Sequence, residues 1–114
     1  MRYFSLYEFN CSFTGNNEMD EGFLKKLDDL REACGFPFHI TSGYRDPEGH
    51  PIEAKKAKGG THAQGIAADI KVNNGVEKYK IISEAMKMGF TGIGVAETFI
   101  HVDTRTSTPV VWSY

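Results

Sequence analysis

The sequence predicts a single α+β domain in which two main helices accompany a small, mainly antiparallel sheet. Three observations support this prediction: two segments have helical spacing of apolar residues, several short segments are rich in β-branched residues, and 114 residues suit one domain. The composition is 40% hydrophobic and 25% charged, which is typical of a folded globular chain. We therefore expect residues 1–114 to form one domain with one core.

The first third of the chain predicts a helical turn and a long amphipathic helix. Ser5 and Glu8 form the Ser-x-x-Glu pattern of a capping box, which predicts a short helical turn there. From Asp20 onward, apolar residues recur at three- and four-residue steps, and Gly35 suits the position just past a helix end. These apolar residues are Phe23, Leu24, Leu27, Leu30 and Cys34.

A long loop and a second helix follow. Residues 43–60 contain two Pro and four Gly with little periodicity, which predicts a loop of a length that is usually functional or disordered. Residues 76–88 predict a helix that Gly89 ends. We expect its apolar face to consist of Tyr79, Ile82, Ala85 and Met86.

Five short segments are predicted to be strands because they are rich in β-branched and aromatic residues between turn signals. They comprise residues 38–41, 67–72, 92–95, 99–104 and 110–112. Within the last of them, Trp112 has two expected positions, the wall of a substrate cleft or the core, and we favour the core in a domain this small.

Composition and charge argue against several classes of protein. The net charge is −2 with a pI near 6.1, so there is no electrostatic case for binding nucleic acid, and the basic residues 55–58 are interpreted as a solvated loop. No apolar stretch approaches the roughly 20 residues of a membrane-spanning helix. The N-terminus lacks the apolar core of a signal peptide, which predicts synthesis in the cytoplasm.

Cys11 and Cys34 are expected to be buried free thiols.

Three residues, two of them in predicted strands and one shortly before a predicted strand, suggest a metal site. His62, Asp69 and His101 offer two imidazoles and a carboxylate, and three protein ligands with one open position are typical of catalytic zinc. Asp69 lies in the apolar segment Ala-Ala-Asp-Ile, where an unpaired carboxylate is costly and a metal ion would compensate its charge. A lone His on a strand is more often structural, so the prediction depends on the combination.

Three ordered motifs carry a resemblance to a known family. They are Ile-Thr-Ser-Gly-Tyr-Arg at residues 40–45, His-x-x-Gly-x-Ala-x-Asp at residues 62–69, and Phe-Ile-His-Val-Asp at residues 99–103. Together they resemble the zinc D-Ala-D-Ala carboxypeptidases, a group that also includes phage L-Ala-D-Glu endopeptidases and the hedgehog signalling domain. The short chain looks most similar to small phage or prophage members.

The resemblance implies a function and roles for particular residues. It implies a Zn²⁺-dependent hydrolase that acts on peptidoglycan stem peptides, as a D-Ala-D-Ala carboxypeptidase or an L-Ala-D-Glu endopeptidase, and we expect a monomer. His62, Asp69 and His101 correspond to the zinc ligands. Arg45 corresponds to an arginine that contacts substrate or stabilises the oxyanion, although a salt bridge that holds the long loop is equally expected of it.

Two positions depart from the family pattern. Gly60 stands where many members have Ser, and Thr98 stands where many have the acidic general base. Glu97 and Asp103 are the remaining candidates for the base. We favour Glu97 as the base if the chain bends before the strand, and Asp103 as the group that orients a ligand histidine. The missing acid leaves open a second hypothesis, a zinc-binding recognition or virion structural domain without turnover.

Overall fold

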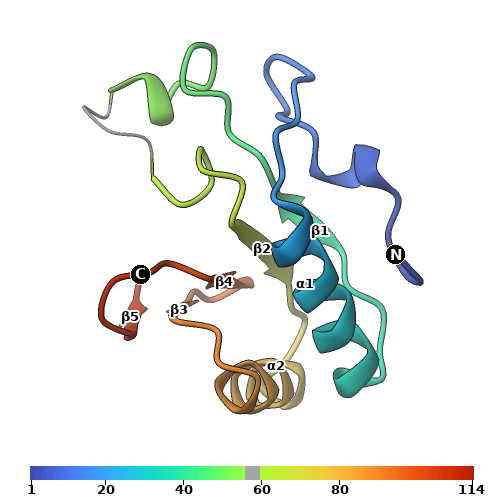
Figure 1. The fold of residues 1–114 in the computed structure, drawn as a ribbon. Coiled ribbons are helices and arrows are strands. Elements are labelled where there is room, and N and C mark those ends of the chain that lie inside the picture. Colours follow the sequence, from blue (N-terminus) through green and yellow to red (C-terminus); the bar gives the residue numbers. More distant parts are fainter. Residues whose placement is uncertain (56–59) are drawn as a thin grey trace.

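A five-stranded sheet forms the centre of the protein. The computed structural model describes residues 1–55 and 60–114, and the segment 56–59, which includes most of the basic run, lies outside the described residues. The strands are β1 (Ile40–Ser42), β2 (Ala67–Lys71), β3 (Gly92–Val95), β4 (Phe99–Asp103) and β5 (Val110–Ser113). Their order is β1-β2-β4-β3-β5, and only the β3–β5 pair is parallel (Figure 1). The predicted α+β class with a mainly antiparallel sheet is therefore confirmed.

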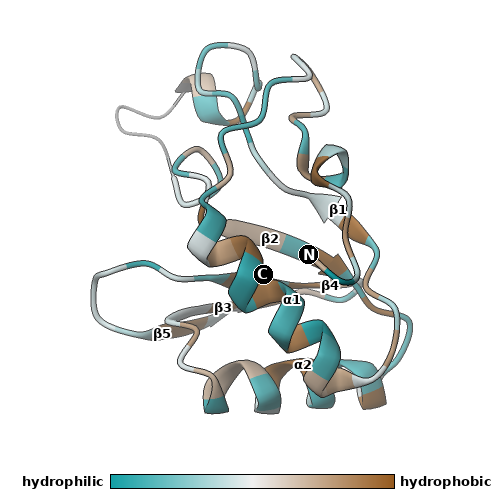
Figure 2. Ribbon diagram, turned by 45° about the vertical axis from the view of Figure 1, so that its right-hand side comes forward, coloured by the Kyte–Doolittle hydropathy of each residue, from teal (hydrophilic) through white to brown (hydrophobic). Residues whose placement is uncertain are grey.

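Two α-helices pack together on one side of this sheet. Helix α1 (Glu21–Cys34) begins after Asp20, whose side chain accepts a hydrogen bond from the backbone N–H of Phe23, and ends at Gly35. Helix α2 (Gly75–Lys87) begins after Asn74, which caps it in the same way. Of the two 3₁₀ turns, η1 (Leu6–Phe9) precedes α1 and carries the expected capping box, and η2 (Glu53–Lys55) lies in the long loop between β1 and β2. Figure 2 shows hydrophobic and hydrophilic residues alternating along each helix, as an amphipathic element requires.

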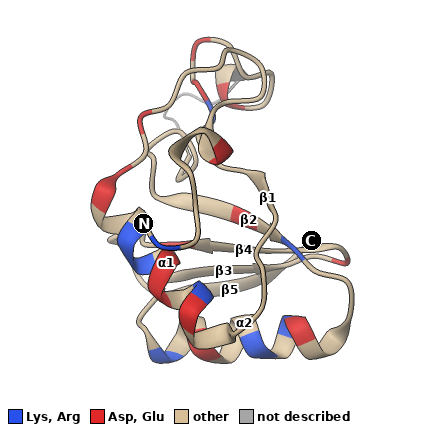
Figure 3. Ribbon diagram, turned by 90° about the vertical axis from the view of Figure 1, so that its right-hand side faces the viewer, with Lys and Arg blue, Asp and Glu red and all other residues tan. Residues whose placement is uncertain are grey.

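The two faces of the sheet differ in chemistry. Side chains alternate along a strand, so neighbouring residues face opposite sides. One face packs against the helices in a continuous core, which includes Leu27 of α1, Ile81 of α2 and Val102 of β4. The other face carries Asp69 and His101, which occupy the intervening positions. Figure 3 shows that charged residues gather on the helices and loops, while the strands carry few of them.

The helical prediction was correct for α1 and partly wrong for α2. All five apolar residues predicted for α1 are buried. In α2 the buried residues are Ile81 and Ala85, whereas Tyr79 is 75% exposed and Met86 is 54% exposed. At 3.6 residues per turn, Tyr79 lies about 200° around the helix from Ile81, so the two cannot face the same core. The apolar character of Tyr79 and Met86 had suggested the wrong face.

The long loop lies at one end of the molecule, beyond β1 and beside the turns around residues 10–17 (Figure 1). Its described part contains η2, so residues 43–60 are not structureless throughout. Both cysteines are buried and free, as predicted. No helix among the described residues is long and apolar enough to cross a membrane.

Candidate metal centre

Two neighbouring strands and one loop turn bring the three predicted ligands together. Asp69 of β2 and His101 of β4 are directly opposite each other in the antiparallel register, so their side chains emerge on the same face. His62 lies in the turn that precedes β2. One ligand atom from each residue lies within 4.8 Å of the others, and all three residues are buried. These three ligand atoms are close enough together to hold one metal ion.

The imidazole of His62 is oriented by the backbone. Its Nδ1 lies 2.8 Å from the carbonyl oxygen of Gly43, which can only accept a hydrogen bond, so Nδ1 carries the proton. In the neutral ring, the lone pair is then on Nε2. This Nε2 lies 3.3 Å from Oδ1 of Asp69. The lone pair of His62 therefore points at a carboxylate.

The imidazole of His101 is oriented by a buried ion pair. Its Nε2 lies 2.7 Å from Oδ2 of Asp103, and Arg105 donates to both oxygens of that carboxylate, from Nε at 3.0 and 3.2 Å and from Nη2 at 2.7 Å. The ionised Asp103 can only accept, so Nε2 of His101 is the donor. The opposite nitrogen, Nδ1, lies 3.0 Å from Oδ1 of Asp69. Asp103 thus lies where a carboxylate fixes the tautomer of a metal-ligating histidine.

Three acceptors consequently converge on one point. In the neutral imidazoles, Nε2 of His62 and Nδ1 of His101 carry lone pairs that face Oδ1 of Asp69, so the site needs a positive charge between them. Protons on these nitrogens, which then donate to Asp69, supply that charge in the metal-free protein, and a bound cation supplies it in their place. Burial alone would raise the pKa of Asp69, but hydrogen bonds with His101 and His62 hold that pKa far below its ordinary value. Burial alone would lower the pKa of His101, but the carboxylates of Asp103 and Asp69 outweigh burial and raise that pKa. A divalent cation fits this donor set.

A close backbone approach supports the Asp103 carboxylate. Gly92 of β3 is paired with Asp103 of β4. A Cβ at Gly92 would lie closer than 3.0 Å to both carboxylate oxygens, so any larger residue would displace them. Gly65 has a similar role beside His62, since it has φ +75° and its space is filled by the backbone of residues 18–20. Glycine at position 92 therefore leaves room for the Asp103 carboxylate, and glycine at position 65 lets the turn that carries His62 pack against residues 18–20.

Arg45 joins the metal site to the long loop. Its Nη2 lies 3.4 Å from Oδ2 of Asp69, and its Nε donates to Oγ of Ser42 at 3.1 Å. On its other side, Nη1 lies 3.8 Å from Oε1 of Glu53, whose side chain is fully buried and also accepts from the backbone N–H of Gly60 at 2.9 Å. Both roles expected of Arg45 are therefore compatible with its position, because it holds the loop and also lines the pocket.

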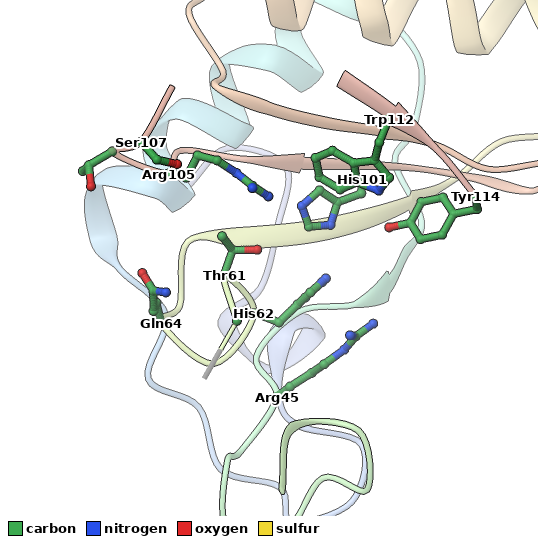
Figure 4. Close-up of a pocket in the computed structure, with 11 residues that line it drawn as sticks. Arg45, Thr61, His62, Gln64, His101, Arg105, Ser107, Trp112 and Tyr114 are labelled. Carbon is green, nitrogen blue, oxygen red and sulfur yellow. The ribbon is translucent and has the colours of Figure 1, made fainter. Parts of the chain in front are cut away.

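A pocket of about 530 Å³ opens onto the two histidines. In Figure 4 the ring of His101 lies between Arg105 and Arg45, and the ring of Trp112 lies beside it. The expectation that Trp112 lies in the core was wrong, because its ring stands 5.0 Å from that of His101 and lines the pocket. Trp112 lies opposite Gly94 in the parallel β3–β5 pair, which leaves room for the indole on this face. Tyr114 lines the pocket beyond it.

The two candidates for a general base lie in different places. Glu97 is exposed in the turn between β3 and β4, and it is not among the described residues that line the pocket. Asp103 is fully buried, with its oxygens hydrogen-bonded to His101 and Arg105.

Sequence reasoning missed two residues that support the site, Glu53 and Arg105. Neither belongs to the three sequence motifs that predict the site, although Arg105 follows the last motif by two residues.

The comparisons with known proteins agree with this geometry. No curated protein and no solved structure gives a significant match to the chain. One family model, described as Peptidase M15, matches residues 2–103, which include all three candidate ligands and Arg45. The match covers nearly the whole chain, and the cluster of His62, Asp69 and His101 is the kind of metal site that a metallopeptidase needs. The chain belongs to the peptidase M15 family.

Proposed function

We propose that this protein is a zinc-dependent hydrolase of peptidoglycan stem peptides. The observation that carries the proposal is the convergence of His62, Asp69 and His101 beside an open pocket that both histidines line. The outward nitrogen of each histidine ring is already held by a hydrogen bond. Zn²⁺ suits two imidazoles and one carboxylate and, when bound, supplies Lewis-acid polarisation of a carbonyl and a water of lowered pKa.

The chain's own residues would then position the substrate and stabilise charge. Arg45 presents its guanidinium beside Asp69 at the pocket wall, where it can stabilise negative charge that develops on a peptide carbonyl oxygen. Glu53 and Ser42 fix that guanidinium from behind, so little reorganisation is needed. Trp112 and Tyr114 supply an aromatic wall along which a peptide can lie.

The first test is the metal content of the purified protein. We expect near-stoichiometric zinc in the native protein and its loss in His62→Ala. His39→Ala is the matched control, since His39 is exposed and lies outside the pocket. A native protein that takes up no zinc when zinc is supplied would overturn the proposal.

The second test is hydrolysis of purified peptidoglycan, with products identified by mass spectrometry. Release of D-alanine would indicate a carboxypeptidase, whereas cleavage between L-Ala and D-Glu would indicate an endopeptidase. An endolysin role as a monomer, with synthesis in the cytoplasm and action on the wall after release, is supported by the resemblance to small phage members. Lysis of cells from without by the purified protein would test it.

A second candidate function is a zinc-binding recognition or virion structural domain without turnover. It is favoured by one observation, that none of the described residues lining the pocket is acidic. The assignment of Glu97 as the base stays a prediction, and Glu97→Gln tests it: loss of hydrolysis with zinc retained would support that assignment. Zinc binding with no cleavage by the native protein would favour the second candidate.

A further inference from the structure

Arg105 occupies a position in the pocket that its structural role does not fully explain. It follows β4, its ion pair with Asp103 holds the carboxylate that orients His101, and its side chain is still 27% exposed. It lines the pocket together with the neighbouring Thr106 and Ser107.

A count of the N–H groups of Arg105 shows that part of the guanidinium is available. Its Nε–H is shared between the two oxygens of Asp103, and one Nη2–H goes to Oδ2. A guanidinium has five N–H groups, so the two on Nη1 and the second on Nη2 remain. No residue in the described part of the chain is recorded as accepting from them.

The guanidinium of Arg105 is also held in one plane. Its Cζ lies 4.9 Å from the centre of the Trp112 ring, and that ring in turn lies 5.0 Å from the ring of His101. Arginine stacked on an aromatic face and paired on one edge presents its other edge in a fixed direction. A fixed planar edge is suited to a carboxylate, which accepts two parallel N–H bonds.

The charge of the pocket wall points to the same ligand. Arg45 and Arg105 both line the pocket, and none of the lining residues in the described ranges is Asp or Glu. Asp69 and Asp103 are buried beneath the wall and already paired with these arginines. The pocket therefore favours an anionic ligand, and more so with a divalent cation at its floor.

We propose that Arg105 is a specificity residue that receives a carboxylate group of the peptide substrate on its outward edge. The inference rests on the proposed peptidase function and names the chemical class of one substrate group. In a stem peptide this carboxylate is either the C-terminal one or the α-carboxylate of a γ-linked D-glutamate residue. A peptide amidated at that position lacks the partner for Arg105 and binds less tightly.

The test measures binding and does not depend on hydrolysis. Trp112 is the only tryptophan in the chain and contacts both His101 and Arg105, so its fluorescence reports on this site. Metal-free protein, dialysed free of chelator, is titrated with two pairs of peptides. One pair is N-acetyl-D-Ala-D-Ala and its C-terminal amide; the other is L-Ala-γ-D-Glu-L-Lys-amide with the glutamate α-carboxyl free or amidated.

We expect native protein to prefer the carboxylate form of one pair by about tenfold, the size of one charge-assisted hydrogen bond. The pair that shows the preference identifies the source of the carboxylate. Arg105→Gln should reduce the preference to less than about twofold, and Arg105→Lys, which keeps the charge without the fork, should retain part of it. Lys25→Gln removes the same charge from an 81% exposed side chain on α1 and should retain the full preference.

Three results would overturn the inference. The first is a native protein that binds the carboxylate and amide forms equally. The second is a preference that survives in Arg105→Gln and disappears in Arg45→Gln, which would assign the carboxylate to Arg45. If Arg105 only held Asp103 in place, its substitution would weaken both peptide forms equally and leave their ratio unchanged. Because binding is read without turnover, absence of hydrolysis would overturn the proposed function alone.

Discussion

Replacing Gly92 by Ala should weaken the metal site although no ligand is altered. A Cβ at this position would lie closer than 3.0 Å to both oxygens of Asp103, and the carboxylate must move away to restore van der Waals contact. The hydrogen bond from His101 to Asp103 is 2.7 Å long and stays effective only to about 3.2 Å, so it tolerates about 0.5 Å of separation. The required movement exceeds this.

The expected size of the effect follows from the role of Asp103. Loss of a carboxylate that orients a metal-ligating histidine typically costs 10–100-fold in metal affinity, or about 1.4–2.8 kcal/mol. Zinc affinity is measured by titrating metal-free protein against a competing chelator, and folding is checked by circular dichroism. Gly75→Ala is the matched control, because a Cβ there meets nothing within 4 Å.

Native zinc affinity in a folded Gly92→Ala protein would refute this reasoning. Should that variant fail to fold, Asp103→Asn gives a second route to the same question, since it removes the charge without adding volume. It too should lose 10–100-fold in zinc affinity, by the general cost of removing such a partner. Native affinity in Asp103→Asn would show that His101 does not depend on this carboxylate.

Three further predictions concern stability and reactivity. Leu27→Ala in the core should lower the free energy of unfolding by about 2–5 kcal/mol in urea denaturation, whereas Val76→Ala, at a 79% exposed position, should change it by less than about 0.5 kcal/mol. Burial opposes ionisation of Asp28, but hydrogen bonds from Arg2 outweigh burial and lower the pKa of this carboxyl group. The ionised group therefore stabilises the fold above about pH 4, and this contribution is lost as the pH falls through the lowered pKa. Asp28→Asn should therefore cost about 1–2 kcal/mol at pH 7 and progressively less below pH 4, and an equal cost at both pH values would contradict this. Burial raises the pKa of Cys34 to about 11, so peptide mapping should find this thiol unmodified by iodoacetamide at pH 8 until denaturant is added.

The fold was largely predictable because its elements have strong local signals. The spacing of Leu27 and its neighbours predicts α1, and the cap at Asp20 and the glycine at Gly35 fix its ends. Helix α2 was located and Ala85 of its predicted apolar face is buried, but Tyr79 and Met86 were wrongly assigned to that face. Tyr79 is apolar enough to suggest burial and amphipathic enough to be stable in water. Local composition alone does not say which side of a helix meets a sheet.

The candidate site was predictable only where a motif carries it. His62, Asp69 and His101 stand in ordered motifs, and the structure brings them together. The contributions of Gly92 and Arg105 depend instead on strand register and on three-dimensional packing against Asp103. The spacing of residues along the chain does not predict that β3 pairs with β4. The contacts of Gly92 and Arg105 with Asp103 could therefore be identified only from the structure.

The three candidate ligands stand on parts of the chain that differ in local stability. Asp69 and His101 face each other across two central strands, which open only when the whole sheet unfolds. His62 lies in a turn outside the sheet, where separate hydrogen bonds take the place of a strand ladder, such as the one from the backbone N–H of Arg45 to its carbonyl oxygen at 3.3 Å. Transient opening of that turn would remove one ligand and leave the other two in register. Exchange of a metal ion held there would thus follow the opening rate of this one turn and require no global unfolding, and amide hydrogen exchange at residues 61–65 would measure that rate.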